Sequence, residues 1–141
     1  MEQRKLLMAF EPAFENVNTA RAAIGGVCAD VFKADVAGVR DFCLAATEAM
    51  NNAVEHSKTD LIRLELSANG QDAVLKMITR SKRFDPTLNR PLPQPGEKDL
   101  PEGGFGLSVI RRLSDGMHYE YRGGKNILTI RKKLGRQSKG G

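Results

Sequence analysis

Hydrophobic positions recur at two different spacings along this chain, and the spacings predict which segments are helices and which are strands. Between Phe14 and Val31, and again from about Val36 to Ser57, they recur at intervals of three and four. This period favours two amphipathic helices. The apolar stripe of the second helix consists of Val39, Phe42, Cys43, Ala46, Met50, Ala53 and Val54.

Alternating patterns predict the strands. Residues 4–10 suit a first strand, and residues 61–68 alternate well between polar and apolar side chains. Asn69-Gly70 then favours a tight turn into a partner strand over residues 73–78. Near the end of the chain, residues 117–122 and 126–133 are expected to form a closing hairpin around Gly123-Gly124.

A long irregular stretch separates these two halves. Residues 80–104 contain Pro86, Pro91, Pro93, Pro95 and Pro101, which exclude a regular helix or a central strand. A loop of this length is typically a functional lid or disordered. Residues 105–113 then suit a short helix. The pattern predicts an α+β two-layer sandwich, in which a mixed, mostly antiparallel five-stranded sheet has about three helices on one face.

Size and composition favour one cytoplasmic domain. With 141 residues, 40% of them hydrophobic and 28% charged, the chain suits a single soluble domain over residues 1–134. It contains no apolar run near the roughly 20 residues that span a bilayer, and its start is too short for a secretory signal. In the cytosol, Cys28 and Cys43 are expected to be reduced and packed as small apolar groups.

The net charge of +5 is concentrated near the end of the chain, in Arg131, Lys132, Lys133, Arg136 and Lys139. A basic segment of this kind attracts nucleic acid or an acidic protein. A solvated, flexible tail at residues 135–141 is favoured instead. Nucleic-acid binding is not expected, because the chain has no recognisable nucleic-acid-binding module and few aromatic residues among its basic ones.

The second predicted helix carries a group of oxygen-bearing side chains. In a regular helix Glu48, Asn52 and Glu55 lie within about 60° of one another, opposite the apolar stripe. The amide oxygen of Asn52 is a suitable ligand for Mg²⁺, and Glu48 can accept a proton from an attacking hydroxyl. An ordinary polar helix face has the same pattern. His56, at the end of this helix, is better explained by the helix dipole than by catalysis.

A glycine-rich run follows the proline-rich stretch. Gly103, Gly104 and Gly106 come just before a helical pattern, with Phe105 and Leu107 among them. Glycines let the backbone approach a ligand closely, and the free N–H groups at a helix start attract phosphate. The run is not a P-loop, because no Gly-Lys-Ser/Thr follows it. A simple hinge or tight turn is the alternative interpretation.

Taken together, these motifs resemble those of a known superfamily. The Glu48-x-x-x-Asn52-x-x-x-His56 helix is similar to the N-box of the GHKL ATPases, and Gly104-Phe105-Gly106-Leu107 is similar to their G2 box. Within this superfamily the chain most resembles the anti-sigma factor serine/threonine kinases of the RsbW and SpoIIAB type, over roughly residues 4–134. The resemblance implies the ATP-binding fold of that superfamily.

The resemblance also implies an activity and partners. Such kinases bind Mg-ATP and a sigma factor, phosphorylate a serine on a STAS-domain anti-sigma antagonist, and are commonly homodimers. Carried onto this chain, Glu48 is the general base and Asn52 the Mg²⁺ ligand. The implied nucleotide-binding positions are Asn52, Glu55, Thr79, Ser81, Phe84, Gly103, Gly104, Phe105, Gly106 and Leu107.

The chain departs from the family pattern at the end of the cleft that binds adenine. Thr79 stands where the family has an Asp that recognises the adenine amino group, and Ser81 stands where it has a glycine. Loss of a charge-assisted hydrogen bond weakens binding by about 1–3 kcal/mol. Two hypotheses follow. One is an active kinase with an unusual adenine pocket, and the other is a non-catalytic regulatory protein that binds a sigma factor or STAS partner without turnover.

Overall fold

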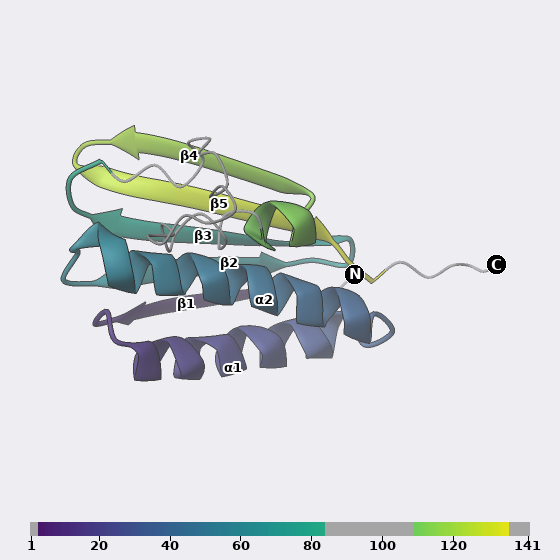
Figure 1. Ribbon diagram of the computed structural model, residues 1–141. Coiled ribbons are helices and arrows are strands. Elements are labelled where there is room, and N and C mark those ends of the chain that lie inside the picture. The colour runs from purple at the N-terminus through teal and green to yellow at the C-terminus, as the bar shows by residue number, and fades with distance from the viewer. Residues whose placement is uncertain (1–2, 84–108, 136–141) are drawn as a thin grey trace, which may run out of the picture.

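The computed structural model describes residues 3–83 and 109–135, and Figure 1 shows how their helices and strands are arranged. In chain order the elements are β1 (Arg4–Phe10), α1 (Phe14–Val31), α2 (Val36–Asn52), the π-helical segment η1 (Ala53–Ser57), β2 (Ile62–Ala68), β3 (Asp72–Arg80), β4 (Gly116–Arg122) and β5 (Lys125–Lys133). A helical turn over residues 109–113 precedes β4.

The strands form one five-stranded sheet in the order β1-β2-β3-β5-β4. All four neighbouring pairs are antiparallel. Helices α1 and α2 lie side by side over one face of this sheet (Figure 1). The predicted two-layer α+β fold with five strands is therefore confirmed, and every pairing in the sheet is antiparallel rather than only most of them.

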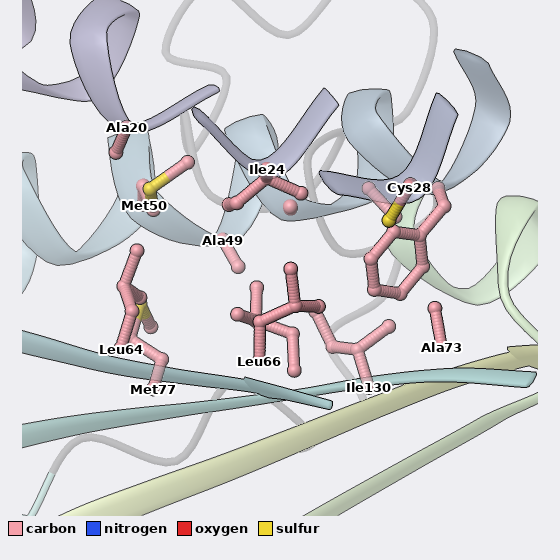
Figure 2. Close-up of a cluster of buried hydrophobic side chains, with 14 of the residues drawn as sticks. Ala20, Ile24, Cys28, Ala49, Met50, Leu64, Leu66, Ala73, Met77 and Ile130 are labelled. Atoms are coloured by element: carbon pink, nitrogen blue, oxygen red, sulfur yellow. The ribbon is translucent and has the colours of Figure 1, made fainter. Parts of the chain in front are cut away.

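The hydrophobic core fills the space between the helices and the sheet. Figure 2 shows side chains of both helices pointing toward those of three strands. The helices contribute Ala20, Ile24, Cys28, Ala49 and Met50, and the strands contribute Leu64, Leu66, Ala73, Met77 and Ile130. All of these are at most 5% exposed.

Strand alternation carries two polar residues into the row of buried positions. Along β3 the buried positions are Ala73, Leu75 and Met77, and the next position in phase is Thr79. Along β5, Leu128 and Ile130 are buried, and Asn126 is in phase with them. Side chains two residues apart on a strand share one face. Thr79 and Asn126 are therefore on the helix-facing side of the sheet.

The start of α2 is fixed by a capping aspartate and a glycine. The Asp35 side chain accepts a hydrogen bond from the Gly38 backbone N–H at 2.9 Å, as expected of an N-cap residue. A Cβ atom at position 38 would lie 2.6 Å from the Leu134 side chain and closer still to the Asp35 carboxylate. Gly38 is therefore required by close packing between the helix start and the segment that follows β5.

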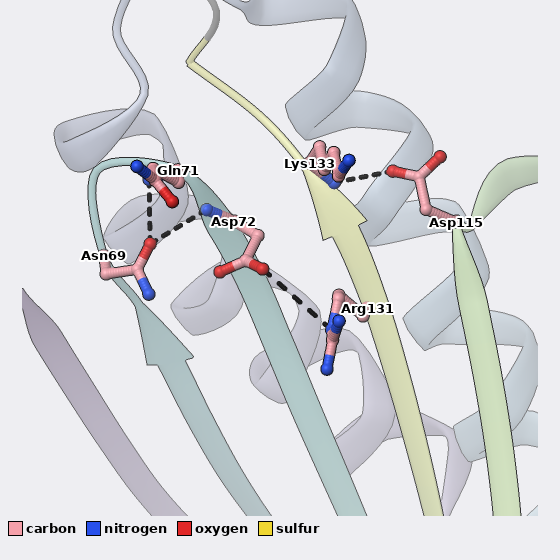
Figure 3. A network of polar contacts seen from close by, with 6 residues as sticks. All are labelled: Asn69, Gln71, Asp72, Asp115, Arg131 and Lys133. Atoms are coloured by element: carbon pink, nitrogen blue, oxygen red, sulfur yellow. Dashed lines mark hydrogen bonds and ion pairs between the residues drawn. The ribbon is translucent and has the colours of Figure 1, made fainter.

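The turn between β2 and β3 differs by one position from its prediction. Asn69 and Asp72 face each other, with the Asn69 N–H donating to the Asp72 carbonyl at 3.1 Å. The tip therefore consists of Gly70 and Gln71 rather than Asn69 and Gly70. Figure 3 shows the reason, because the Asn69 side-chain oxygen accepts hydrogen bonds from the backbone N–H groups of Gln71 and Asp72. Such a side chain belongs at the first position of a turn.

The same end of the sheet is closed by contacts with β5. Figure 3 shows Asp115 accepting a hydrogen bond from the Lys133 N–H, at 2.6 Å, and Asp72 next to Arg131. The Leu134 N–H donates to the Gln71 carbonyl at 2.9 Å. These contacts hold the start of β4 and the end of β5 beside the β2–β3 turn.

The second helix is not a regular α-helix to its predicted end at Ser57. It is α-helical to Asn52 and continues as the π-helical segment η1. The predicted helix over residues 105–113 is described only from 109 onward, where it is helical and buries Ile110. Most of the predicted irregular stretch, and the tail from residue 136, lie outside the described residues. In the part of the chain that the structure describes, no helix combines the length and apolar character needed to cross a membrane.

The two cysteines are packed as predicted, and both are free of disulfides. Burial and, to a smaller extent, the nearby Cys43 raise the pKa of Cys28 to about 12. Burial also raises the pKa of Cys43, and the opposing effect of Arg21 is smaller. Both side chains therefore stay neutral thiols at neutral pH.

Candidate functional site

The C-terminal end of α2 places the two most specific site residues of the sequence in one region. Glu48 is half-buried, and Asn52, one turn further along the helix, is 5% exposed. Side chains four residues apart on a helix are neighbours. The prediction that Asn52 lies opposite the buried stripe is wrong, because Asn52 is itself buried. Ala45 and Ala49 are buried too, and Asn52 continues that row at its end. The apolar stripe is wider than the sequence pattern indicated.

The Asn52 amide has no hydrogen-bond partner among residues 3–83 and 109–135, and neither has the Glu48 carboxylate. Every fully buried side-chain nitrogen and oxygen of the described residues has a hydrogen-bond partner. Because the Asn52 amide has none, its polar atoms are not fully buried and keep some contact with solvent. A buried amide normally finds a hydrogen-bond partner within the protein. An amide that is nearly enclosed yet open to solvent at its polar end is well placed to bind a ligand.

Glu55 is placed differently from the prediction. The sequence argument assumed α-helical geometry through Ser57, but Glu55 lies in the wider π-helical turn. It is exposed, and one of its carboxylate oxygens lies 3.6 Å from Nε2 of His56. The regular 100° rotation per residue therefore does not extend from Asn52 to Glu55. Single π-helical turns inside helices often occur at functional sites.

A buried threonine joins the end of this helix to the end of β3. The Thr59 hydroxyl donates to the Leu61 carbonyl at 2.8 Å and accepts a hydrogen bond from the Arg80 backbone N–H at 3.2 Å. In the adjoining ladder, Ile62 of β2 lies opposite Thr79 of β3. The segment after η1 therefore lies beside the last residues of β3, so Thr79 and the helix end occupy the same end of the molecule.

Thr79 is paired with Asn126 across β3 and β5. Both are buried, at 3% and 4% exposure. Like Asn52, Thr79 has no side-chain hydrogen-bond partner within the described ranges, and its hydroxyl keeps some contact with solvent. A hydroxyl can rotate and can act as either donor or acceptor. Thr79 is therefore a second buried polar group available to a ligand at this end of the sheet.

Asn126, by contrast, is fully engaged by its neighbours. Its amide nitrogen donates to the Ser81 hydroxyl at 3.0 Å and to the Lys82 carbonyl at 3.1 Å, and its oxygen accepts from the Tyr119 hydroxyl at 2.5 Å. The Arg83 guanidinium lies 5.7 Å from the centre of the Tyr119 ring, within the range of a cation–π contact. Residues 81–83 are therefore held against β4 and β5.

Sequence reasoning assigned neither Asn126 nor Tyr119 to the site. The available signal was the position of Asn126 in phase with Leu128 and Ile130 on a buried face. The remaining predicted site residues lie outside the described ranges and stay predictions: Phe84, Gly103, Gly104, Phe105, Gly106 and Leu107.

The described residues contain no group of three His, Cys, Asp or Glu side chains arranged as a metal site. A magnesium ion that arrives with a nucleotide does not need one, because phosphate and water oxygens supply most of its ligands. The unpartnered Asn52 amide, one turn from Glu48, can supply the single protein oxygen that such an ion still needs.

The family described as "Histidine kinase-like ATPase domain" matches residues 10–132. In sequence, the chain is 33% identical over 93 residues to the serine/threonine-protein kinase BtrW of Bordetella bronchiseptica. That match covers 62% of this chain and 65% of BtrW, so the chain matches less than two thirds of the length of that relative.

Several solved structures share the fold. The RsbU and RsbW domains of Rv1364c from Mycobacterium tuberculosis align with a TM-score of 0.64 at 20% identity, over 95% of this chain and 33% of theirs. The Acinetobacter baumannii histidine kinase AdeS aligns with a TM-score of 0.55 at 17% identity, over 94% of this chain and 70% of AdeS. With a family match over most of its length and a two-layer fold that carries the expected Glu-x-x-x-Asn helix, the chain belongs to the histidine kinase-like ATPase domain family.

Proposed function

We propose that the protein is a Mg-ATP-dependent serine/threonine protein kinase of the anti-sigma factor type. It phosphorylates a STAS-domain antagonist and, in the alternate state of a partner switch, sequesters a sigma factor. The single observation that carries the proposal is the unpartnered, nearly enclosed Asn52 amide, one helical turn from Glu48, in a fold of the ATPase-domain family. The similarity to BtrW, a serine/threonine-protein kinase, supports this choice among the activities of the family.

The two helix residues have separate roles in this proposal. The Asn52 amide oxygen holds Mg²⁺, whose remaining ligands are phosphate and water oxygens. Glu48, on the same side of the helix, accepts the proton of the serine hydroxyl. When bound, Mg-ATP supplies the phosphoryl group and the charge neutralisation, so the protein contributes mainly positioning and a proton acceptor.

The rigid surroundings of Asn52 support a positioning role. Ala49 precedes it by one turn and is fully packed, and the Ala53 N–H donates to the backbone carbonyls of both Ala49 and Met50. A side chain held on a packed helix keeps its geometry better than one on a loop. The change to π-helical geometry begins at the next residue, which separates the orientation of Asn52 from that of Glu55.

A second candidate function is a regulatory protein that binds its sigma factor or STAS partner without turnover. The observation that favours it is the pairing of Thr79 with Asn126, where the family has a carboxylate to read adenine. Buried hydrogen bonds already occupy the Asn126 amide, so it does not replace that carboxylate. This alternative predicts no nucleotide binding at millimolar concentrations.

The test is calorimetric titration of the nucleotide-free full chain with Mg-ATP, with Asn52→Ala and Asn51→Ala as a matched pair. Asn51 is the same residue type one position earlier, and its side chain is rotated by about 100° around the helix. We expect micromolar binding by the wild type and Asn51→Ala, and none by Asn52→Ala. Equal binding by both variants would reject the assigned site, and absence of binding by the wild type would favour the non-catalytic candidate.

A further inference from the structure

We propose that the base-recognising end of this site does not distinguish ATP from GTP, and that the chain binds both purine nucleoside triphosphates. The inference rests on the proposed nucleotide site and concerns its selectivity. Thr79 is the residue that determines it. A carboxylate at this position would only accept hydrogen bonds, whereas a hydroxyl both donates and accepts.

The polar groups around the end of β3 and the start of β5 differ in whether they have hydrogen-bond partners. Ser81 donates to the Lys82 carbonyl at 3.0 Å and accepts from the Asn126 amide. Asn126 in turn uses both its nitrogen and its oxygen, the latter with Tyr119. Within the described part of the chain, Thr79 is the member of this group whose side chain has no protein partner.

A rotatable hydroxyl at position 79 can pair with the 6-substituent of either purine base. When one rotatable hydroxyl makes the polar contact, it accepts from the 6-amino group of adenine or donates to the 6-oxo group of guanine. In either arrangement the hydroxyl and the 6-substituent of the base are both paired, so this contact does not supply the unpaired polar group that usually causes strong discrimination. Thr79 therefore does not reject a 6-oxo purine in the way that a carboxylate at this position would.

The charges near Thr79 also affect which base is bound. The group made of Thr79, Ser81, Tyr119 and Asn126 contains no carboxylate, and it is followed by Lys82 and by Arg83, which lies over the Tyr119 ring. Arginine and lysine pair well with the O6 and N7 acceptors of guanine. An aspartate at position 79 would instead face the guanine O6 with a negative charge. Without a carboxylate at position 79, charge at this end does not select against the O6 acceptor of guanine.

The test is separate titration of the full chain with Mg-ATP, Mg-GTP and Mg-CTP, using the wild type, Thr79→Asp and Thr79→Val. We expect the wild-type dissociation constants for ATP and GTP to lie within about tenfold of each other, the difference expected of neutral hydrogen bonds. Thr79→Asp should favour ATP over GTP by at least about tenfold more than the wild type does, through charge-assisted bonding and repulsion of O6. Thr79→Val, which keeps the shape, should weaken both purines equally.

Thr129→Val is the matched control. Thr129 is on β5, three residues from Asn126, and points to the opposite face of the sheet, so its replacement should leave both affinities unchanged. Wild-type binding of ATP with GTP more than about 100-fold weaker would overturn this inference and leave the proposed function intact. Binding of neither purine would overturn both. The ratio of the wild-type dissociation constants for ATP and GTP decides the test even when Thr79→Asp does not fold.

Discussion

The hydroxyl of Tyr119 on β4 donates a hydrogen bond to the side-chain oxygen of Asn126 on β5, across the helix-facing side of the sheet. The same Asn126 amide donates to Ser81 and to the Lys82 carbonyl beyond β3. One buried side chain thus connects β4 and β5 with the segment that follows β3. Because its bonds are made in a buried setting, each is costly to leave unmade.

Replacement of Asn126 by alanine should lower the free energy of unfolding by about 1–3 kcal/mol, because Ser81, Tyr119 and the Lys82 carbonyl lose a partner. Asn52→Ala is the matched control, since Asn52 is buried to a similar extent and has no partner among the described residues. Its cost should be less than about 1 kcal/mol. Urea denaturation of both variants measures the difference, and equal losses would contradict the assigned network.

Glu48→Gln should reduce phosphoryl transfer to a purified STAS-domain protein by about 10²–10⁴-fold, the usual contribution of a general base. Mg-ATP affinity should change little, because the amide keeps the shape of the carboxylate. Transfer of labelled phosphate and calorimetric titration measure the two effects separately.

Glu65→Gln is the control for that experiment. Glu65 is exposed on β2, on the face of the sheet away from the helices, so its replacement should leave transfer unchanged. Normal transfer by Glu48→Gln would show that another group accepts the proton.

Gly38→Ala should destabilise the protein by about 1–3 kcal/mol, the usual cost of overpacking. The added methyl group would meet the Leu134 side chain at 2.6 Å and the capping carboxylate of Asp35. Gly26→Ala is the control, because a Cβ there meets nothing within 4 Å in the middle of α1. That variant should gain about 0.5–1 kcal/mol from helix propensity. Thermal unfolding of both variants shows whether each substitution raises or lowers stability. Destabilisation by both would point to a general effect of alanine in these helices.

Cys28 should make stability depend on alkaline pH. Its folded-state pKa is raised from 9.0 to about 12, mainly by burial, so the unfolded chain loses the thiol proton at lower pH than the folded one. The stabilising contribution is complete below about pH 9 and is lost as the pH rises toward 12. Denaturation of the wild type and Cys28→Ala between pH 8 and 10.5 measures how the free energy of unfolding of each protein changes with pH. A parallel decline in the two proteins would contradict the assignment.

Much of the fold followed from periodicity, because each element buries one face. The bounds of β1 and α1 match their predictions, and the paired positive φ angles of Gly123 and Gly124, at 62° and 76°, explain the closing hairpin. The Asn69 turn was displaced by one residue because the Asn69 side chain bonds to the backbone beyond it.

The site was less predictable, for physical reasons that involve particular residues. Glu48 and Asn52 followed from helical spacing, but the widening of the helix after Asn52 removed Glu55 from that alignment. The role of Asn126 depends on strand order, because β5 pairs with β3 although β4 precedes it in the chain. A pairing between residues 79 and 126 has no local signature in the sequence.

The position of β5 between β3 and β4 has a consequence for the order in which the protein matures on the ribosome. Chains emerge from their N-terminal end, so β1, β2 and β3 can pair while β4 waits for its only described neighbour. Asn126 arrives with that last strand, and Leu134 contacts the start of α2 later still. Nascent chains that have not yet released β5 therefore lack Asn126 and the hydrogen bonds that it makes to Ser81, Lys82 and Tyr119, and the five-stranded sheet is complete only once β5 has emerged.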